Sequence, residues 1–244
     1  SKLTNANFNN ANLENAKLTG ANLEQTTFVN TNLKNSILYH TNFDSAQLSN
    51  LNFSNLDLSG VDFYNSTLTN SNFENSKLYG ANFQHANLEN TNFKNANLSG
   101  ADLEDANLQF ATFENANLQL VNFKNPFGGP LNTNNLFKGT NFKNANLYGA
   151  YLSSADLSNK DLSYTNLEGT DFRGANLSGA NLTGTILKNT KLINSNIDNV
   201  IFENIQFLSF EHSYQNSLEP ISQSLGYIER VTIKIINKYF LNSI

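Results

Sequence analysis

Residues 81–100 read ANFQH ANLEN TNFKN ANLSG, and this stretch contains the rule by which most of the chain is built. A large apolar residue, Phe or Leu, occurs at every fifth position, which we call the centre. The residue two before each centre is small, and the residue two after it is Asn, Gly or His. A period of five fits neither the 3.6-residue period of a helix nor the two-residue period of a strand. The pattern therefore predicts a short repeating unit instead of long helices or strands.

The same rule extends from the quoted stretch toward both ends of the chain. Leu or Phe occupies all 25 centres from Leu3 to Phe123, and Leu, Phe or Ile occupies all 15 centres from Phe137 to Phe207. Two residues that lie two apart share one side of an extended backbone, so each repeat presents a small and a large apolar side chain inward. The position two before the centre is Ala, Ser, Thr or Val in 35 of the 40 repeats. The exceptions are Leu51, Leu56, Asn135, Lys160 and Ile205.

The residues around each centre predict a corner in every repeat. Of the 40 positions two after the centre, 20 are Asn and ten are Gly, although the whole chain has only 13 Gly. Asn and Gly adopt turn dihedrals, including positive φ, at the least steric cost. The residue directly before the centre is Asn in 20 repeats and Asp in six, and such side chains bond the backbone at turns. Each pentapeptide therefore predicts one short side and one corner.

Repeats such as residues 11–15 (ANLEN) and 175–179 (ANLSG) resemble the pentapeptide-repeat family, whose pattern is A-(D/N)-(L/F)-x-x. The resemblance covers about residues 1–209 and implies an all-β fold, a right-handed quadrilateral β-helix with four repeats to a coil. Forty repeats would then make about ten coils. From Phe43 to Leu98 the centres alternate strictly between Phe and Leu. On a four-sided coil this alternation predicts Phe on two opposite faces and Leu on the other two.

The repeat is interrupted once and ends before the C-terminus. Between Phe123 and Phe137 the chain has nine more residues than a regular spacing needs, and residues 126–130 hold two of its three Pro. Pro and Gly end strand pairing, so we predict a projecting loop at about residues 125–135 within one helix of residues 1–209. The tail, residues 210–244, predicts a helix that starts near Pro220. This tail would be a C-terminal helical cap or, as in gyrase-targeting members of the family, a dimerisation element that makes a homodimer.

Composition excludes several classes of protein and site. The absence of Cys excludes disulfides and thiolate metal sites. Only 14% of residues are charged and the net charge is −5, so direct nucleic-acid binding is not expected. No apolar run has the length of a membrane span, and the three His have neither metal-ligand nor catalytic-triad spacing. We expect a cytoplasmic protein that is not an enzyme and needs no cofactor or metal, with a removed targeting segment left open because the chain has no Met.

Departures from the consensus predict a partner-binding patch near the interruption. The patch would combine acidic residues one coil below the loop, bulky residues at corners where Asn or Gly is usual, and the loop itself: Asp102, Glu104, Asp105, Phe110, Leu120, Phe127, Gly128 and Gly129. Solvated charges and tolerated substitutions are the alternative interpretation of the same residues. Lys160, at an inward position, predicts a local opening of the coil through which its ammonium reaches water.

The family resemblance implies two functions of different kinds. One is a non-enzymatic scaffold that binds another protein, which the sequence does not identify. The other is a DNA mimic that binds, inhibits or protects DNA gyrase or topoisomerase IV. A mimic needs a sustained negative potential; residues 1–124 have eleven acids against six bases, but Lys34 and Lys94 interrupt the acids on one face. A purely structural role in a larger chain is the third alternative.

Overall fold

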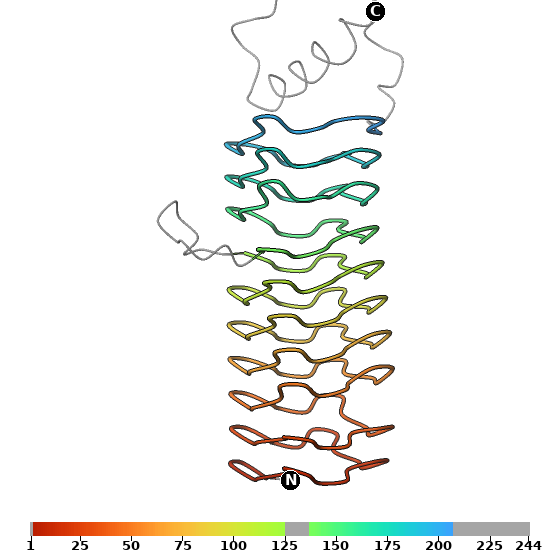
Figure 1. Cartoon of the computed structure of the whole chain (residues 1–244), viewed down its shortest axis with the longest axis vertical. Helices are drawn as coiled ribbons and strands as arrows, with labels where there is room; N and C mark the ends of the chain where they lie inside the picture. Colours follow the sequence, from red (N-terminus) through yellow and green to blue (C-terminus); the bar gives the residue numbers. More distant parts are fainter. Residues whose placement is uncertain (1, 125–136, 207–244) are drawn as a thin grey trace, which may run out of the picture.

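The computed structural model describes residues 2–124 and 137–206, and in these residues the repeat builds a four-sided β-helix (Figure 1). Each repeat contributes one isolated bridge residue directly before the centre and a two-residue turn after it, and the described residues contain no helix and no longer strand. Bridge residues pair in parallel with a partner twenty residues on, as Asn72 does with Asn92. Four pentapeptides therefore make one coil, which confirms the predicted quadrilateral β-helix.

A left-handed residue forms the corner of every described repeat. The residue two after the centre has a positive φ at all 38 described corner positions, 28 of them occupied by residues other than Gly. Asn75 has a φ of 58° and Gly80 a φ of 62°. The next backbone N–H closes the turn on the carbonyl of the centre, as in the 3.1 Å bond from Ala81 to Leu78. A positive φ at the third residue of such a turn defines type II, which favours Gly and Asn, so the predicted role of these residues is confirmed.

The core consists of columns of centres that stack along the helix axis. Phe73 is fully buried, and its ring stacks on Phe53 at 4.8 Å and on Phe93 at 5.0 Å between ring centroids. It also makes edge contacts across the core with Phe63 at 5.8 Å and Phe83 at 5.9 Å. One column is Phe53, Phe73, Phe93, Phe113 and Phe142, and the other contains Phe43, Phe63 and Phe83. The predicted segregation of Phe to two opposite faces is confirmed.

The bridge ladder continues from one side of residues 125–136 to the other. Thr112 pairs with Asn141, and Asn122 pairs with Tyr151, in each case 29 residues on instead of twenty. The coil that resumes at Phe137 therefore packs directly on the coil before it. The predicted loop at about 125–135 and the predicted helical cap or dimerisation element in 210–244 lie outside the described residues.

The ladder opens beside Lys160, as predicted from its unusual inward position. No bridge joins Asn141 to Asp161, although Asp161 pairs with Asn181 on its other side. The side chain of Lys160 is half-buried. Burial lowers the pKa of Lys160, and Asp156 opposes that shift. The long side chain therefore fits only where the coil separates from the coil that precedes it.

A second opening lies between residues 32–38 and 52–58, which we call the seam (Figure 1). No bridge joins Asn32 to Asn52 or Ile37 to Asp57, whereas Asn52 and Asp57 pair with the coil that follows. The sequence marked Leu51 and Leu56 as large residues at small inward positions, but gave no expectation of an opening there. The physical cause is the same as at Lys160, because an inward side chain that is too long for its position separates two coils.

Candidate partner-binding surface

The three acidic residues of the predicted patch lie on one face and one corner of the same coil, where they are half-buried. Asp102 accepts hydrogen bonds from Gln84 Nε2 at 2.8 Å and from Asn122 Nδ2 at 3.0 Å. The same Asn122 amide donates to Glu104 Oε2 at 3.0 Å. These carboxylates are bonded to neighbouring coils, so part of their hydrogen-bonding capacity is already used within the helix.

Asp105, at the corner that follows, faces a basic partner. Its Oδ2 lies 3.9 Å from His85 Nδ1 in the preceding coil. Burial raises the pKa of Asp105; His85 opposes that shift and Glu104 adds to it. The Asp105 carboxylate is half-buried and lies beside the imidazole of a neighbouring coil. The acidic residues of the predicted patch are therefore engaged with neighbouring coils instead of being freely exposed.

Phe110 and Leu120 are the two exposed apolar corners that the sequence placed in the patch. Phe110 is 47% exposed, and Lys138 Nζ lies 5.7 Å from the centroid of its ring. Leu120 is 54% exposed. The two residues are ten positions apart, and ten residues are half of a twenty-residue coil, so they occupy opposite corners of the rod. The structure therefore does not bring them together in one patch, because residues that are close in sequence and at a similar level along the rod can still lie on opposite sides of it.

Both exposed apolar corner side chains lie over a glycine of the next coil. A Cβ placed on Gly139 would meet Phe110 Cδ1, and a Cβ on Gly149 would lie 2.7 Å from Leu120 Cδ2. Three further pairs follow the same rule: His40 over Gly60, Asn159 over Gly179 and Tyr164 over Gly184. The glycine leaves room for the side chain, which is held at the corner. This arrangement was missed from the sequence, although a bulky corner followed one coil later by Gly is its signal.

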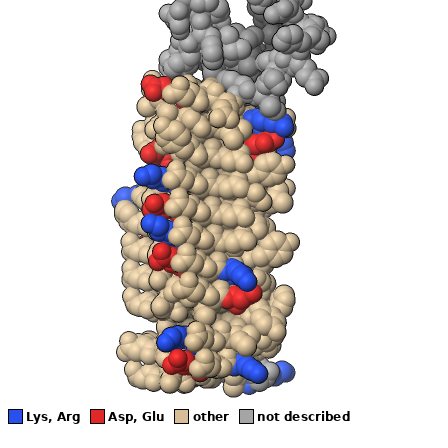
Figure 2. Space-filling model, turned by 90° about the vertical axis from the view of Figure 1, so that its right-hand side faces the viewer, with Lys and Arg blue, Asp and Glu red and all other residues tan. Residues whose placement is uncertain are grey.

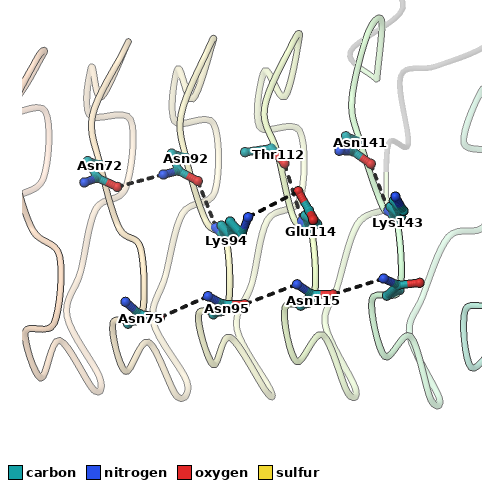
Figure 3. Close-up of polar contacts among 11 residues, drawn as sticks. Asn72, Asn75, Asn92, Lys94, Asn95, Thr112, Glu114, Asn115, Asn141 and Lys143 are labelled. Atoms are coloured by element: carbon teal, nitrogen blue, oxygen red, sulfur yellow. Dashed lines mark hydrogen bonds and ion pairs between the residues drawn. The ribbon is translucent and has the colours of Figure 1, made fainter.

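Four ion pairs join acidic and basic side chains of consecutive coils. Lys94 Nζ lies 3.7 Å from Glu114 Oε2 (Figure 3), and Lys34 Nζ lies 3.7 Å from Glu14 Oε1. Similar pairs join Lys77 to Asp57 at 3.8 Å and Lys188 to Glu168 at 3.1 Å. Figure 2 shows one face that is largely uncharged, with its acidic and basic side chains close together. Adjacent opposite charges cancel at a distance, so these four pairs contribute little sustained negative potential.

Asparagine side chains form two kinds of ladder along the rod (Figure 3). At the position before the centre, Asn92 Nδ2 donates to Asn72 Oδ1 at 3.0 Å, and Asn92 Oδ1 accepts from the backbone of Lys94 at 3.0 Å. At the corner, Asn95 Nδ2 donates to Asn75 Oδ1 at 3.1 Å. The amides therefore link consecutive coils and bond the turn, which confirms the predicted role of Asn before the centre.

The remaining members of the predicted patch, Phe127, Gly128 and Gly129, lie outside the described residues. Within residues 2–124 and 137–206 there is no cluster of three or more His, Cys, Asp or Glu side chains that could hold a metal ion. The described part of the chain also has no helix long and apolar enough to cross a membrane.

The fold and its surfaces define a repeat solenoid built of five-residue units. The chain belongs to the pentapeptide-repeat family: the model of a pentapeptide repeat region matches residues 1–83 and 66–126, and the model of pentapeptide repeats in eight copies matches residues 136–159 and 165–204. Members of this family form right-handed quadrilateral β-helices. A comparison by sequence with curated proteins gives no match.

Solved structures of the same family resemble the chain. HetL, a pentapeptide repeat protein involved in heterocyst differentiation regulation in the cyanobacterium Nostoc sp. strain PCC 7120, is 26% identical, with a TM-score of 0.51. The match covers 84% of this chain and 86% of HetL. QnrB1, a plasmid-mediated fluoroquinolone resistance protein, is 22% identical over 83% of this chain and 86% of its own, with a TM-score of 0.33.

Proposed function

We propose that the protein is a non-enzymatic scaffold that binds another protein through the exposed corners of its β-helix. The observation that carries this proposal is the pair of apolar corners, Phe110 and Leu120, which replace Asn or Gly and remain about half exposed. Gly139 and Gly149 beneath them leave room for these side chains. Exposed aromatic and aliphatic side chains in fixed positions are typical anchors of protein interfaces. The part that HetL has in regulation supports a role of this kind.

The two corners face opposite sides of the rod, so we expect the partner to wrap around this level of the helix or to contact it through two segments. Phe127 of the predicted loop would add a third anchor at the same level. The acidic residues Asp102, Glu104 and Asp105 would contribute polar contacts at the rim. Cytoplasmic localisation and a homodimer through residues 210–244 belong to the same proposal.

Comparative affinity capture tests the proposal in cells that contain the natural partner. Phe110→Asn and Leu120→Asn restore the commonest corner residue, so the helix should stay folded, as thermal unfolding would verify. We expect each substitution, and deletion of residues 126–134, to remove the same partner, with a loss of about 2 kcal/mol for a central anchor. Glu74→Ala, on the wall away from these corners, is the control and should retain the partner. An unchanged set of partners in all variants would contradict the proposal.

DNA mimicry is tested in parallel by a gyrase supercoiling assay. A mimic should inhibit or protect gyrase with an effect that weakens steeply as salt rises, because it must replace a row of phosphates. Reversal of Asp102, Glu104 and Asp105 to Lys should then abolish the effect. The pairing of acids with bases between coils favours the scaffold instead, and we expect no salt-sensitive effect on gyrase.

A further inference from the structure

The seam leaves backbone hydrogen-bonding groups without partners between coils that are paired with their other neighbours. In a regular coil, the N–H before the centre donates to the preceding coil and the centre N–H donates to the following one, as Asn72 does to Leu51 and Phe53 does to Asn72. The equivalent bonds from Asn52 to Thr31 and from Leu33 to Asn52 are absent. Such groups keep a strong tendency to bind a donor or acceptor.

A cavity of about 400 Å³ occupies this opening. Its lining comes from both coils and includes Thr31, Leu33 and Lys34 on one side and Asn52, Ser54 and Leu56 on the other. Beside it, Ser36 Oγ is the one buried side-chain polar atom of the described residues that has no hydrogen-bond partner. The equivalent Ser76 Oγ, in a closed coil, donates to the carbonyl of Phe73 at 2.7 Å. Unpaired backbone, an orphaned hydroxyl and an open volume thus occur at one place.

The side-chain ladder is broken at the same level. Asn32 Nδ2 donates to Asn12 at 3.0 Å on one side of the seam, and Asn72 Nδ2 donates to Asn52 at 3.4 Å on the other. No hydrogen bond joins Asn32 to Asn52 within the described chain. The ladder therefore lacks the one amide–amide hydrogen bond that would cross the seam.

We propose that the seam binds an extended segment of another polypeptide as an inserted parallel strand. The middle residue of three would donate its N–H to the Thr31 carbonyl and accept a bond from the Leu33 N–H. The residue before it would accept from the Asn52 N–H, and the residue after it would donate to the Asn52 carbonyl. These four bonds follow the ordinary parallel pattern, in which one residue faces one neighbour and its flanking residues face the other.

The environment of the seam also determines which side chains fit. The middle side chain would point outward between Asn32 and Asn52, where Asn would complete the amide ladder. The two flanking side chains would point inward, where Leu33, Leu51 and Leu56 are already buried. We therefore expect small residues such as Ala or Gly on both sides of the middle residue. The inference rests on the proposed function, because it names one class of protein segment that the scaffold takes.

Hydrogen exchange and peptide titration, both followed by NMR, test the inference on the intact protein. The free protein should exchange the amide protons of Leu33 and Asn52 at least about tenfold faster than those of Phe73 and Asn92 in closed coils. The probe is acetyl-Ala-Asn-Ala-amide, which should slow both seam amides and shift their resonances. Methylation of the backbone nitrogen of its Asn removes the N–H that would donate to the Thr31 carbonyl, and this change should weaken binding about tenfold. Equal exchange in seam and closed coils, or no shift at saturating peptide, would overturn the inference and indicate a closed or merely water-filled seam.

A variant that closes the seam supplies the matched control. Leu51→Ala with Leu56→Ala restores small inward residues, so the amides of Leu33 and Asn52 should become protected and the peptide should no longer bind. If this variant does not fold, the comparison of the methylated and unmethylated peptides on the unaltered protein still decides the question. If the peptide does not bind at the seam but Phe110→Asn still removes the partner, the proposed function stands without the inference about the seam. Peptide binding without any effect of the corner substitutions would contradict only the corner surface.

Discussion

The ladder is continuous from Asn42 to Asn122, whereas it is broken between residues 32–38 and 52–58 although the centres follow the same rule in both regions. Every bridge position from Asn42 to Asp102 pairs with the position twenty residues on. At the seam, two consecutive bridges are absent although the centres Leu33 and Phe53 are still buried. The difference lies in the small inward position, which decides whether a coil can approach the one before it. The centres stabilise the rod by burial, whereas the residue two before each centre determines whether two coils come close enough to form bridges.

Removal of a ring from a closed column should have the largest effect. Phe73→Ala deletes a fully buried ring that contacts four other rings, and we expect a loss of about 3 to 5 kcal/mol in the free energy of unfolding. Chemical denaturation measures this loss. Glu74→Ala, one residue along but on the outer wall, should change stability by less than about 0.5 kcal/mol. Similar losses for both variants would show that the assignment of inward and outward positions is wrong.

The same substitution in the closed part and at the seam sharpens the comparison further. Leu78→Ala, in a column that is paired on both sides, should cost about 2 to 5 kcal/mol, because the cavity cannot collapse. Leu51→Ala should cost roughly half as much or less, because the coils can approach and restore backbone bonds that are now absent. Denaturation of the two variants measures the difference. A Leu51→Ala variant as unstable as Leu78→Ala would indicate that the seam is held open by something other than this side chain.

Most of the fold was predictable because a period of five leaves few alternatives. The corners, the columns of Phe and the continuation across residues 125–136 follow from which residue type occupies each position of the repeat. The opening at Lys160 was also predictable, since a charged side chain cannot remain in an apolar core. The opening at Leu51 and Leu56 was not anticipated, because an apolar residue at an inward position satisfies the hydrophobic pattern and its excess volume is not visible in that pattern.

The candidate surface was harder to predict than the fold. The sequence identified Phe110 and Leu120 as unusual corners, but it grouped them by their nearness along the chain. The count of twenty residues per coil places them on opposite sides of the rod. To group residues into one patch, their position around the rod axis is needed as well as their position along it. The acids Asp102 and Glu104 were identified as unusual too, but their bonds to Asn122 depend on side-chain geometry that no repeat pattern specifies.

Two glycine corners separate the cost of backbone conformation from the cost of displaced side chains. Gly100→Ala, with a φ of 69° and no atom within 4 Å of the added Cβ, should cost about 1 to 2 kcal/mol from the left-handed backbone alone. Gly149→Ala has the same backbone cost and must also displace Leu120, so we expect a further loss of about 0.5 to 1.5 kcal/mol. Thermal unfolding measures both. Combining Gly149→Ala with Leu120→Asn should recover part of the extra loss, and equal losses for the two glycine variants would contradict the contact.

The smallest effect is expected at the second opening, where Lys160 can be replaced by the small residue that the repeat prefers. Burial lowers the pKa of Lys160 in the folded protein, so the unfolded chain holds the proton more tightly, and stability should rise as pH increases through the lowered pKa toward the ordinary value. Lys160→Ala removes this dependence and lets the coils approach, so it should stabilise the protein by up to about 1 kcal/mol at neutral pH. Denaturation at neutral and at alkaline pH measures both effects. A variant that loses stability, or that keeps the pH dependence of the unaltered protein, would show that the ammonium is already well solvated and that the opening at residues 139–144 and 158–163 has another cause.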